Sequence, residues 1–339
     1  MRSINQMLFL RVPDSEDSPY RQHELKEATH PRHYSDFLAG QYSLDWLPRS
    51  PHSLKPGDLI ANARTARRGH GGMLAVAPSS FIPFALGLGL VRRPYYLVFW
   101  GNASRSKLRR LIVRANLFLA QRVIVSDRDT RDELITKWKM PPAKIAWLPL
   151  PVDTDYYRPV AAPRGDNVLV PGDTKRDEAL VLAMAEKGDW TIVRSVKNCA
   201  GLGLYAGHPA IGSGRILIKK WATFSEIRAN TQHALAVLLP FEECPEPVGL
   251  TALLEGMACG RPVIISPGRA ARDHVVHGQT GFVLSGDRST WVTQIAEILG
   301  QRSRLDEVGA RAREYVVARH SFEAAKAAWA DTLKKGTDA

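Results

Sequence analysis

The sequence predicts an α/β protein made of two Rossmann-like, doubly wound domains, and three observations lead to that prediction. The chain has 339 residues, enough for two domains of roughly 100 to 200 residues each. Short apolar runs alternate with segments of helical length, as in a parallel sheet covered on both faces. A proline-rich stretch at residues 140–153 separates two such series. We therefore expect an N-terminal domain at 1–151 and a C-terminal domain at 152–319.

The first half contains three strand signals, at residues 7–12, 95–100 and 122–125. Residues 106–122 have the length of a helix, with Ser106 in the position of an N-cap, and a second helix is predicted at 129–139. Residues 13–58 suggest only a helix at about 19–28. The uncharged run 73–91 is long enough to span a membrane, but its prolines and serines favour a strand end, a loop and a buried helix.

The second half repeats the alternation more regularly. Its predicted strands are 167–172, 189–195, 215–221, 235–241, 261–266 and 281–284, and its predicted helices are 177–188, 224–234, 250–260, 289–300 and 303–320.

The net charge of +12 is concentrated in the first half. Residues 1–150 carry 23 Lys and Arg against 12 Asp and Glu, whereas residues 151–339 carry 23 against 22. Between Leu59 and Ser126 there are eleven basic residues and no acidic one. Such a distribution favours a polyanionic partner, which could be nucleic acid, anionic lipid or a phosphorylated substrate.

No residue pattern indicates a metal or a cofactor. The three cysteines form no CxxC pair, which argues against a disulfide framework or a structural zinc site and favours the cytoplasm. The apolar run near the start of the chain is too short for a signal peptide, and acidic residues follow it within a few positions. Asp153 and Asp155 form a DxD in the linker, and His30 and His33 are expected to be solvated loop residues.

Residues 235–266 form the most informative segment. An apolar strand runs into a loop with Glu242, Glu243 and Glu246, and Gly249 then opens a helix that carries Glu255 one turn after Thr251. Ligands of open α/β sheets bind beyond the carboxyl ends of strands, and a glycine at a helix N-terminus lets an anion approach. Carboxylates suit sugar hydroxyls. The alternative interpretation is a solvated acidic loop before an ordinary amphipathic helix.

This run resembles the signature of retaining GT-B glycosyltransferases of family 4, the group 1 glycosyltransferases. There a Glu, a Gly-Leu pair, a second Glu and Met-Ala-x-Gly-x-Pro-Val follow in order. Residues 123–159, 274–284 and 319–333 also resemble family segments, so the similarity extends from about Pro94 to the C-terminus. The resemblance implies sugar transfer from a nucleotide diphosphate donor on the second domain to an acceptor on the first. It also allows the terminal helix, residues 320–337, to pack back on the first domain.

The resemblance implies a role for each matching residue. Glu246 would contact the donor-sugar hydroxyls, Glu255 the ribose, and the amides of Gly249, Leu250 and Thr251 the sugar and diphosphate. Lys175 and Arg176, which follow Gly172, would be the cations on the diphosphate, although they could also be a basic helix start. The leaving phosphate would take the acceptor's proton on the front face, with no metal or other cofactor.

Two departures from the family pattern affect the site. Eight residues separate Glu246 from Glu255 where the family has seven, so Glu243 is the reserve candidate for the first glutamate. Trp100 and Gly101 stand where the family has His-Gly, and Trp100 could stack on a sugar face instead. These departures motivate a second interpretation, a catalytically silent homologue that acts as a partner or sugar-binding protein.

The basic half indicates what the acceptor side contacts. On a helix at 106–122, Lys107, Arg110 and Arg114 lie at spacings of three and four. Apolar residues offer another side: Leu108, Leu111, Ile112, Phe118 and Leu119. This pattern suits docking on an anionic bilayer and a lipid-linked or cell-surface glycan acceptor at the inner leaflet, and the alternative is an ordinary charged outer face. No nucleic-acid-binding module is recognisable, so we expect no nucleic-acid partner.

Overall fold

The computed structural model describes most of the chain. The described residues are 8–11, 43–46, 48–49, 53–68, 73–76, 83, 85–86, 95–99, 106–161, 164–196, 202–220, 223–244 and 248–335. They divide into two compact units, one containing 8–151 with 322–335 and the other containing 152–321. Both ends of the second unit meet at one hydrogen bond, from the Val152 amide to the His320 carbonyl at 2.8 Å.

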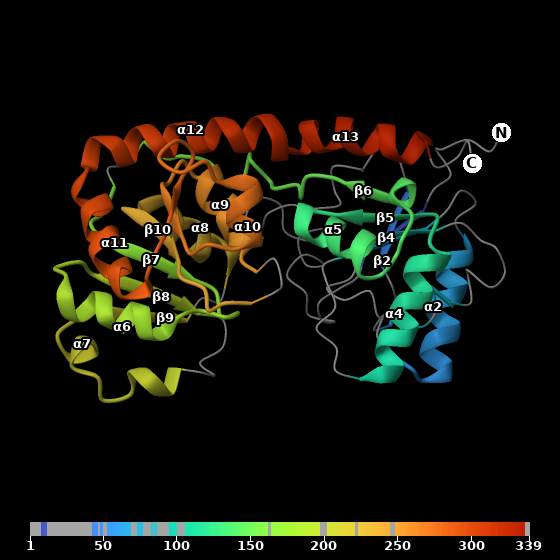
Figure 1. Cartoon of the computed structure of the whole chain (residues 1–339), viewed down its shortest axis with the longest axis horizontal. Coiled ribbons are helices and arrows are strands. Elements are labelled where there is room, and N and C mark those ends of the chain that lie inside the picture. The colour runs from blue at the N-terminus through green and yellow to red at the C-terminus, as the bar shows by residue number, and fades with distance from the viewer. Residues whose placement is uncertain are drawn as a thin grey trace. The chain divides into compact units, whose positions relative to one another are not determined.

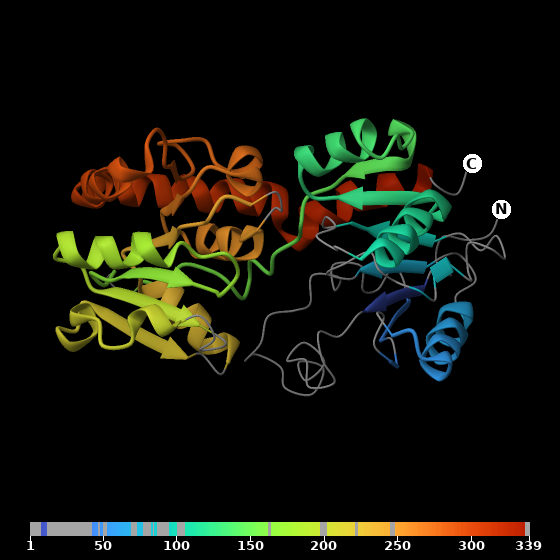
Figure 2. The same ribbon diagram turned by 60° about the horizontal axis from the view of Figure 1, so that its bottom comes forward.

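The first unit contains a six-stranded parallel sheet in the order β2-β1-β3-β4-β5-β6 (Figures 1 and 2). Its strands are β1 (Leu8–Arg11), β2 (Ser43–Trp46), β3 (Met73–Val76), β4 (Tyr95–Val98), β5 (Arg122–Val125) and β6 (Ile145–Trp147). Its helices are α2 (Pro56–Arg68), α4 (Lys107–Leu119), α5 (Arg128–Thr136) and α13 (Phe322–Lys335), with a short 3-10 turn η3 (Pro142–Lys144). The predicted strands near 7–12, 95–100 and 122–125 are confirmed.

Helix α4 begins as its sequence predicts. The Ser106 side chain accepts a hydrogen bond from the Arg109 amide, which caps the first turn. Val113 and Leu117 are buried against β4 and β5 residues in the core of this unit. Helix α2 and strand β2 were not predicted, and the predicted helix at 19–28 lies outside the described residues.

The second unit contains another six-stranded parallel sheet, in the order β12-β11-β10-β7-β8-β9. Its strands are β7 (Val168–Pro171), β8 (Ile192–Val196), β9 (Ile216–Lys220), β10 (Ala236–Leu239), β11 (Val263–Ile265) and β12 (Phe282–Val283). Its helices are α6 (Glu178–Lys187), α7 (Pro209–Gly212), α8 (Phe224–His233), α9 (Leu250–Ala258), α10 (Arg269–His274), α11 (Trp291–Gly300) and α12 (Arg302–His320), with the 3-10 turns η4 (Leu202–Tyr205) and η5 (Arg288–Thr290). All six predicted strands and all five predicted helices of this half are present.

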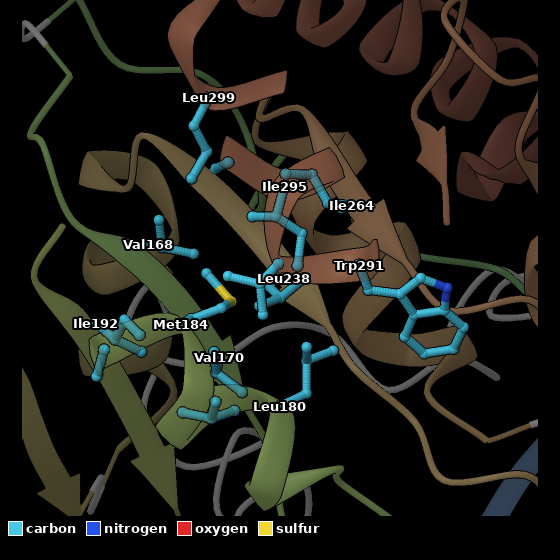
Figure 3. Close-up of a cluster of buried hydrophobic side chains, with 14 of the residues drawn as sticks. Val168, Val170, Leu180, Met184, Ile192, Leu238, Ile264, Trp291, Ile295 and Leu299 are labelled. Atoms are coloured by element: carbon cyan, nitrogen blue, oxygen red, sulfur yellow. The ribbon is translucent and has the colours of Figure 1, made fainter. Parts of the chain in front are cut away.

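The core of the second unit joins α6 and α11 to the sheet (Figure 3). Met184 and Leu180 of α6 lie among Val168 and Val170 of β7, and Ile295 of α11 packs in the same cluster. Strand order reverses between β7 and β10, which therefore form the switch point where α/β sheets bind ligands. No helix in the described part of the chain is long and apolar enough to cross a membrane.

Candidate functional site

Two loops meet at the switch point of the second sheet. Residues 172–176 follow β7, and residues 240–244 follow β10, which pairs with β7 in parallel; Gly249 precedes α9. Arg176 and Phe241 form an isolated antiparallel bridge. The Glu242 amide donates to the Lys175 carbonyl at 3.0 Å, and the Asp177 amide donates to the Pro240 carbonyl at 2.9 Å. The two loops are therefore one hydrogen-bonded unit.

The Phe241 ring of the second loop contacts Arg176 of the first. The Arg176 guanidinium carbon lies 4.4 Å from the centroid of the Phe241 ring. Gly249 also lies against this ring, because a Cβ added to Gly249 would overlap a ring carbon of Phe241. Gly249 also has φ of 79° and is the N-cap of α9, so both its backbone conformation and the close ring exclude other residues.

Arg176 is a structural part of its own loop. Its side chain is buried, with Nε donating to the Pro171 carbonyl and Nη1 donating to the Thr174 carbonyl, each at 2.8 Å. Burial lowers the pKa of Arg176 to about 9, and the nearby Arg194 acts in the same direction. A Cβ on Gly172 would lie 2.9 Å from Arg176 Nη2. Gly172 has φ of 80°, a left-handed backbone conformation that favours glycine, and this explains the glycine after β7.

Lys175 lies next to Arg176 in sequence but differs from it in burial, in backbone conformation and in the partners of its side chain. It is exposed, and its backbone has φ of 54°, a left-handed conformation that costs a non-glycine residue about 1 to 2 kcal/mol. It forms no ion pair with the described residues. Its ammonium group is therefore available to a ligand, whereas the Arg176 guanidinium is committed to the loop.

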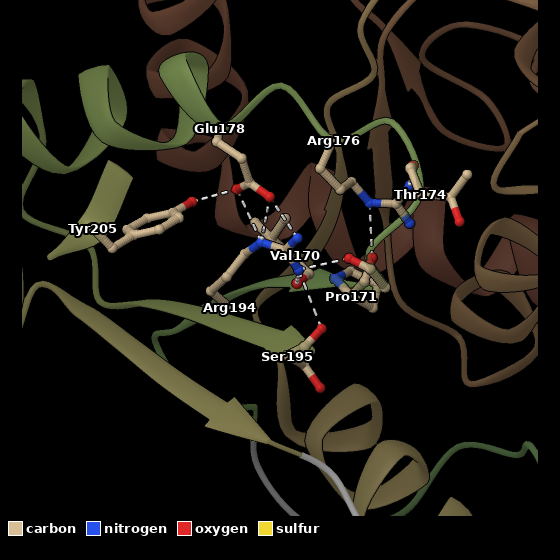
Figure 4. A network of polar contacts seen from close by, with 9 residues as sticks. Val170, Pro171, Thr174, Arg176, Glu178, Arg194, Ser195 and Tyr205 are labelled. Carbon is tan, nitrogen blue, oxygen red and sulfur yellow. Dashed lines mark hydrogen bonds and ion pairs between the residues drawn. The ribbon is translucent and has the colours of Figure 1, made fainter. Parts of the chain in front are cut away.

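A buried ionic network contacts the loop after β7 through Arg194 (Figure 4). Arg194 of β8 has 1% side-chain exposure and pairs with Glu178 of α6, with Nη2 2.6 Å from Oε1. The Tyr205 hydroxyl donates to the other Glu178 carboxylate oxygen. Arg194 Nη1 donates to the Gly172 carbonyl at 2.6 Å, so the network fixes the residue at which the loop begins.

Helix α9 carries the second candidate glutamate away from these loops. Leu250 is buried, Thr251 is exposed, and Glu255 is partly buried in the second turn. Burial raises the pKa of Glu255 to about 7, and a hydrogen bond from the Tyr157 hydroxyl acts in the opposite direction. A carboxyl of this kind is half protonated near neutral pH, so it could donate as well as accept a hydrogen bond.

The structure brings together only part of the predicted set. Gly172, Lys175, Arg176 and Gly249 lie in the two joined loops, and Glu243 lies exposed in the second of them. Glu246, Trp100 and Gly101 are outside the described residues. The described residues contain no group of His, Cys, Asp and Glu that could hold a metal ion. Asp153 of the DxD instead accepts a hydrogen bond from the Tyr156 amide at 3.2 Å.

Sequence reasoning missed the residues that support the loops, namely Glu178, Arg194, Tyr205 and Phe241. One signal was present for Arg194, because a charged residue inside an apolar strand needs a buried partner. No signal in the sequence pairs Phe241 with Gly249 and Arg176.

Comparisons with known proteins concern the family and the fold of the chain. Residues 209–301 match the sequence model of the family "Glycosyl transferases group 1". The GDP-mannose-dependent alpha-(1-6)-phosphatidylinositol monomannoside mannosyltransferase of Mycobacterium tuberculosis is 29% identical over 223 residues. That match covers 59% of this chain and 58% of the relative, so the chain aligns with little more than half of the relative's length.

Solved structures resemble the chain over almost its whole length. Sucrose-phosphate synthase from Thermosynechococcus elongatus gives a TM-score of 0.74 at 16% identity, covering 97% of this chain and 98% of that one. HepE of Anabaena, solved in complex with UDP, gives a TM-score of 0.72 at 14% identity and covers 97% and 99%. At these identities the likeness concerns the fold, which is the two-domain GT-B architecture.

Proposed function

We propose that this chain, a member of the group 1 glycosyltransferases with the GT-B fold, transfers a sugar from a nucleotide diphosphate donor to an acceptor. One observation carries the proposal beyond the family match. The loops after β7 and β10 are hydrogen-bonded into one unit at the switch point, with an exposed lysine on one and the glycine-capped N-terminus of α9 ending the other. A cation and a helix N-terminus are groups that bind an anionic diphosphate.

Within this proposal Lys175 is the cation on the diphosphate and Arg176 positions it. The backbone N–H groups of Gly249, Leu250 and Thr251 point out of the N-terminal end of α9, where they would donate to oxygens of the donor. Glu255 accepts from the ribose, and Glu246, or Glu243 in its place, accepts from the donor-sugar hydroxyls. Trp100 and Gly101 are proposed donor-binding residues, with Trp100 stacking on a sugar face.

The proposed reaction retains the configuration of the sugar. The bond from the anomeric carbon to the diphosphate oxygen breaks, the acceptor oxygen bonds to the same face of that carbon, and the released diphosphate takes the acceptor's proton. Lys175 and the α9 N-terminus stabilise the charge that develops on the diphosphate. No metal is required, so the rate should be unchanged by a chelator.

The acceptor is proposed to be a lipid-linked or cell-surface glycan precursor, met in the cytoplasm at the inner face of the membrane. The mycobacterial relative is named for GDP-mannose and a phosphatidylinositol mannoside, and HepE was solved with UDP. These names make GDP-mannose and a UDP-sugar the first donors to test. The excess of basic residues lies in the first half of the chain, where an anionic acceptor would be held, and we propose no role in nucleic-acid binding.

A thermal-shift panel of UDP, GDP, ADP and their sugars tests the proposal. We expect one nucleotide class to raise the melting temperature, because a ligand that binds only the folded state stabilises it. The Lys175→Ala variant should reduce that shift, and Lys187→Ala, an exposed lysine of α6, should not. If no nucleotide shifts the wild type, the enzyme proposal fails. If nucleotides bind and no sugar is hydrolysed or transferred, the silent homologue becomes the better interpretation.

A further inference from the structure

The outward face of helix α4 is unusual in composition. The buried face consists of Val113, Asn116 and Leu117. The leucine stripe, defined as Leu108, Leu111 and Leu119, is instead exposed, at 57%, 64% and 40%. At about 100° per residue its centre lies roughly 150° from the centre of the buried face. An amphipathic surface helix normally turns polar residues to that side, so these leucines contribute nothing to the core of their own unit.

Cations border the leucine stripe along one side. The basic row, defined as Lys107, Arg110 and Arg114, is exposed and lies on adjacent turns of the helix. The Arg114 guanidinium carbon also lies 5.5 Å from the centroid of the Phe118 ring. No acidic residue occurs in α4 or anywhere between Leu59 and Ser126, so nothing in this stretch of sequence neutralises the row.

We infer that this face of α4 docks on an anionic lipid bilayer. The leucines would enter the boundary between headgroups and acyl chains, and the basic row would contact anionic headgroups beside them. Charge complementarity selects this occupant. A single helical stripe is small for a protein interface, which usually buries more than about 1,000 Å² in total. A nucleic acid would meet aliphatic side chains in place of the stacking rings that it favours.

This docking would bring a lipid-linked acceptor to the first unit, and in that respect it extends the proposed function. Vesicle binding is measured without donor or acceptor, so its outcome is independent of whether sugar transfer occurs. A protein that binds nucleotides but not vesicles loses only this inference, and one that binds vesicles but not nucleotides loses only the proposed function.

The test is co-sedimentation of the full chain with phosphatidylcholine vesicles, with and without phosphatidylglycerol, over a series of salt concentrations. We expect binding to the anionic vesicles that weakens as salt increases. The Leu108→Ser, Leu111→Ser, Leu119→Ser variant should lose at least about tenfold in partition coefficient. The Lys107→Gln, Arg110→Gln, Arg114→Gln variant should lose about fivefold per charge, or roughly a hundredfold.

Matched controls distinguish binding through this face from nonspecific binding to vesicles. Leu204→Ser removes a leucine of 62% exposure from the second unit, and Lys187→Gln, Lys219→Gln, Lys220→Gln removes three exposed lysines there. Both should bind vesicles like the wild type. Unchanged melting temperatures will show that the α4 variants fold. The inference is overturned if the wild type ignores anionic vesicles or the α4 variants still bind. It is also overturned if the leucine variant only converts a dimer to a monomer.

Discussion

Helix α4 of the first unit and two arginines of the second unit place basic side chains in opposite environments. In the second unit, the guanidinium groups of Arg194 and Arg313 point inward and donate to backbone carbonyls, Arg194 to Gly172 and Arg313 to Tyr157 at 2.9 Å. On α4 of the first unit, Lys107, Arg110 and Arg114 are exposed. Formal charge counts these groups alike. The difference teaches that the positive charge on α4 faces solvent, whereas part of the charge in the nearly neutral half holds loops in place.

The largest expected effect comes from removing a buried arginine. Arg194→Met leaves the Glu178 carboxylate without the cation with which it pairs. Breaking a buried ion pair in this way typically lowers the free energy of unfolding by about 3 to 5 kcal/mol. Arg110→Met on α4 should change the free energy of unfolding by no more than about 0.5 kcal/mol. Urea denaturation of both variants measures the contrast. The double variant Glu178→Gln, Arg194→Met should recover part of the loss, and equal costs for Arg194 and Arg110 would break the comparison.

A second prediction examines the stack that Arg176 forms with Phe241. Gly249→Ala forces a Cβ against the Phe241 ring at a positive φ, and we expect a loss of about 2 to 4 kcal/mol in the free energy of unfolding. Gly286 also has a positive φ, of 67°, but nothing lies within 4 Å of its added Cβ. Gly286→Ala should therefore cost only about 1 kcal/mol. Similar losses in the two variants would show that the ring contact does not constrain the loops.

A third prediction extends the comparison from cations to a buried carboxyl. Because the pKa of Glu255 is about 7 in the folded state, above the ordinary glutamate pKa of 4.5 expected in the unfolded chain, the folded protein keeps this proton between the two pH values. Stability from this group is full below pH 4.5 and falls as pH rises to about 7. Glu255→Gln should thus be more stable than the wild type above pH 7, by up to about 3 kcal/mol.

The same measurement contains its own control. The difference in unfolding free energy between Glu255→Gln and the wild type should vanish near pH 4, where both side chains are neutral. A constant difference across the pH range would mean that the carboxyl titrates normally and that α9 does not bury it.

The smallest effect should be a gain. Lys175→Gly removes the strain of a left-handed non-glycine residue, and after the entropy of glycine in the unfolded state we expect about 0.5 to 1 kcal/mol of added stability. Nucleotide affinity should fall at the same time, because the exposed cation is lost. Lys139→Gly, at φ of 57° in the first unit, should gain the same stability and leave nucleotide binding unchanged. Denaturation and titration calorimetry together distinguish a strained ligand-binding residue from an idle one.

Most of the fold could be predicted from the sequence because its strands are apolar and its helices are long. Strand β10 and helix α9 stand out in this way, as does α4 with its Ser106 cap. Strand β2 contains Asp45, and α2 is dominated by Ala and Arg, so neither has a strong hydrophobic pattern. The position of β2 depends on its pairing with β1, which is distant in sequence and which a local pattern cannot show.

The candidate site was predictable in place but not in detail. The rule that ligands bind beyond strand ends predicts a site in the segments after 171 and 239, and the structure joins these two segments by hydrogen bonds. It cannot show that the Arg176 side chain turns back on its own loop while its neighbour Lys175 faces solvent, because that depends on the Phe241 ring across the sheet. On α4 the leucines were grouped with half-buried Ile112 and Phe118, although helical geometry separates an exposed stripe from the buried face.

The hydrogen bond between Val152 and His320 has a topological consequence. Among the described residues, the second unit is one stretch of chain, 152–321, and its first residue and the residue before its last are joined by a hydrogen bond of 2.8 Å. A stretch whose two ends meet can be closed into a ring by a few added residues and reopened at another exposed turn without breaking its sheet. Residues 152–321 therefore have the connectivity of a portable module, one that a circular permutation or a transplant into another host loop would leave intact.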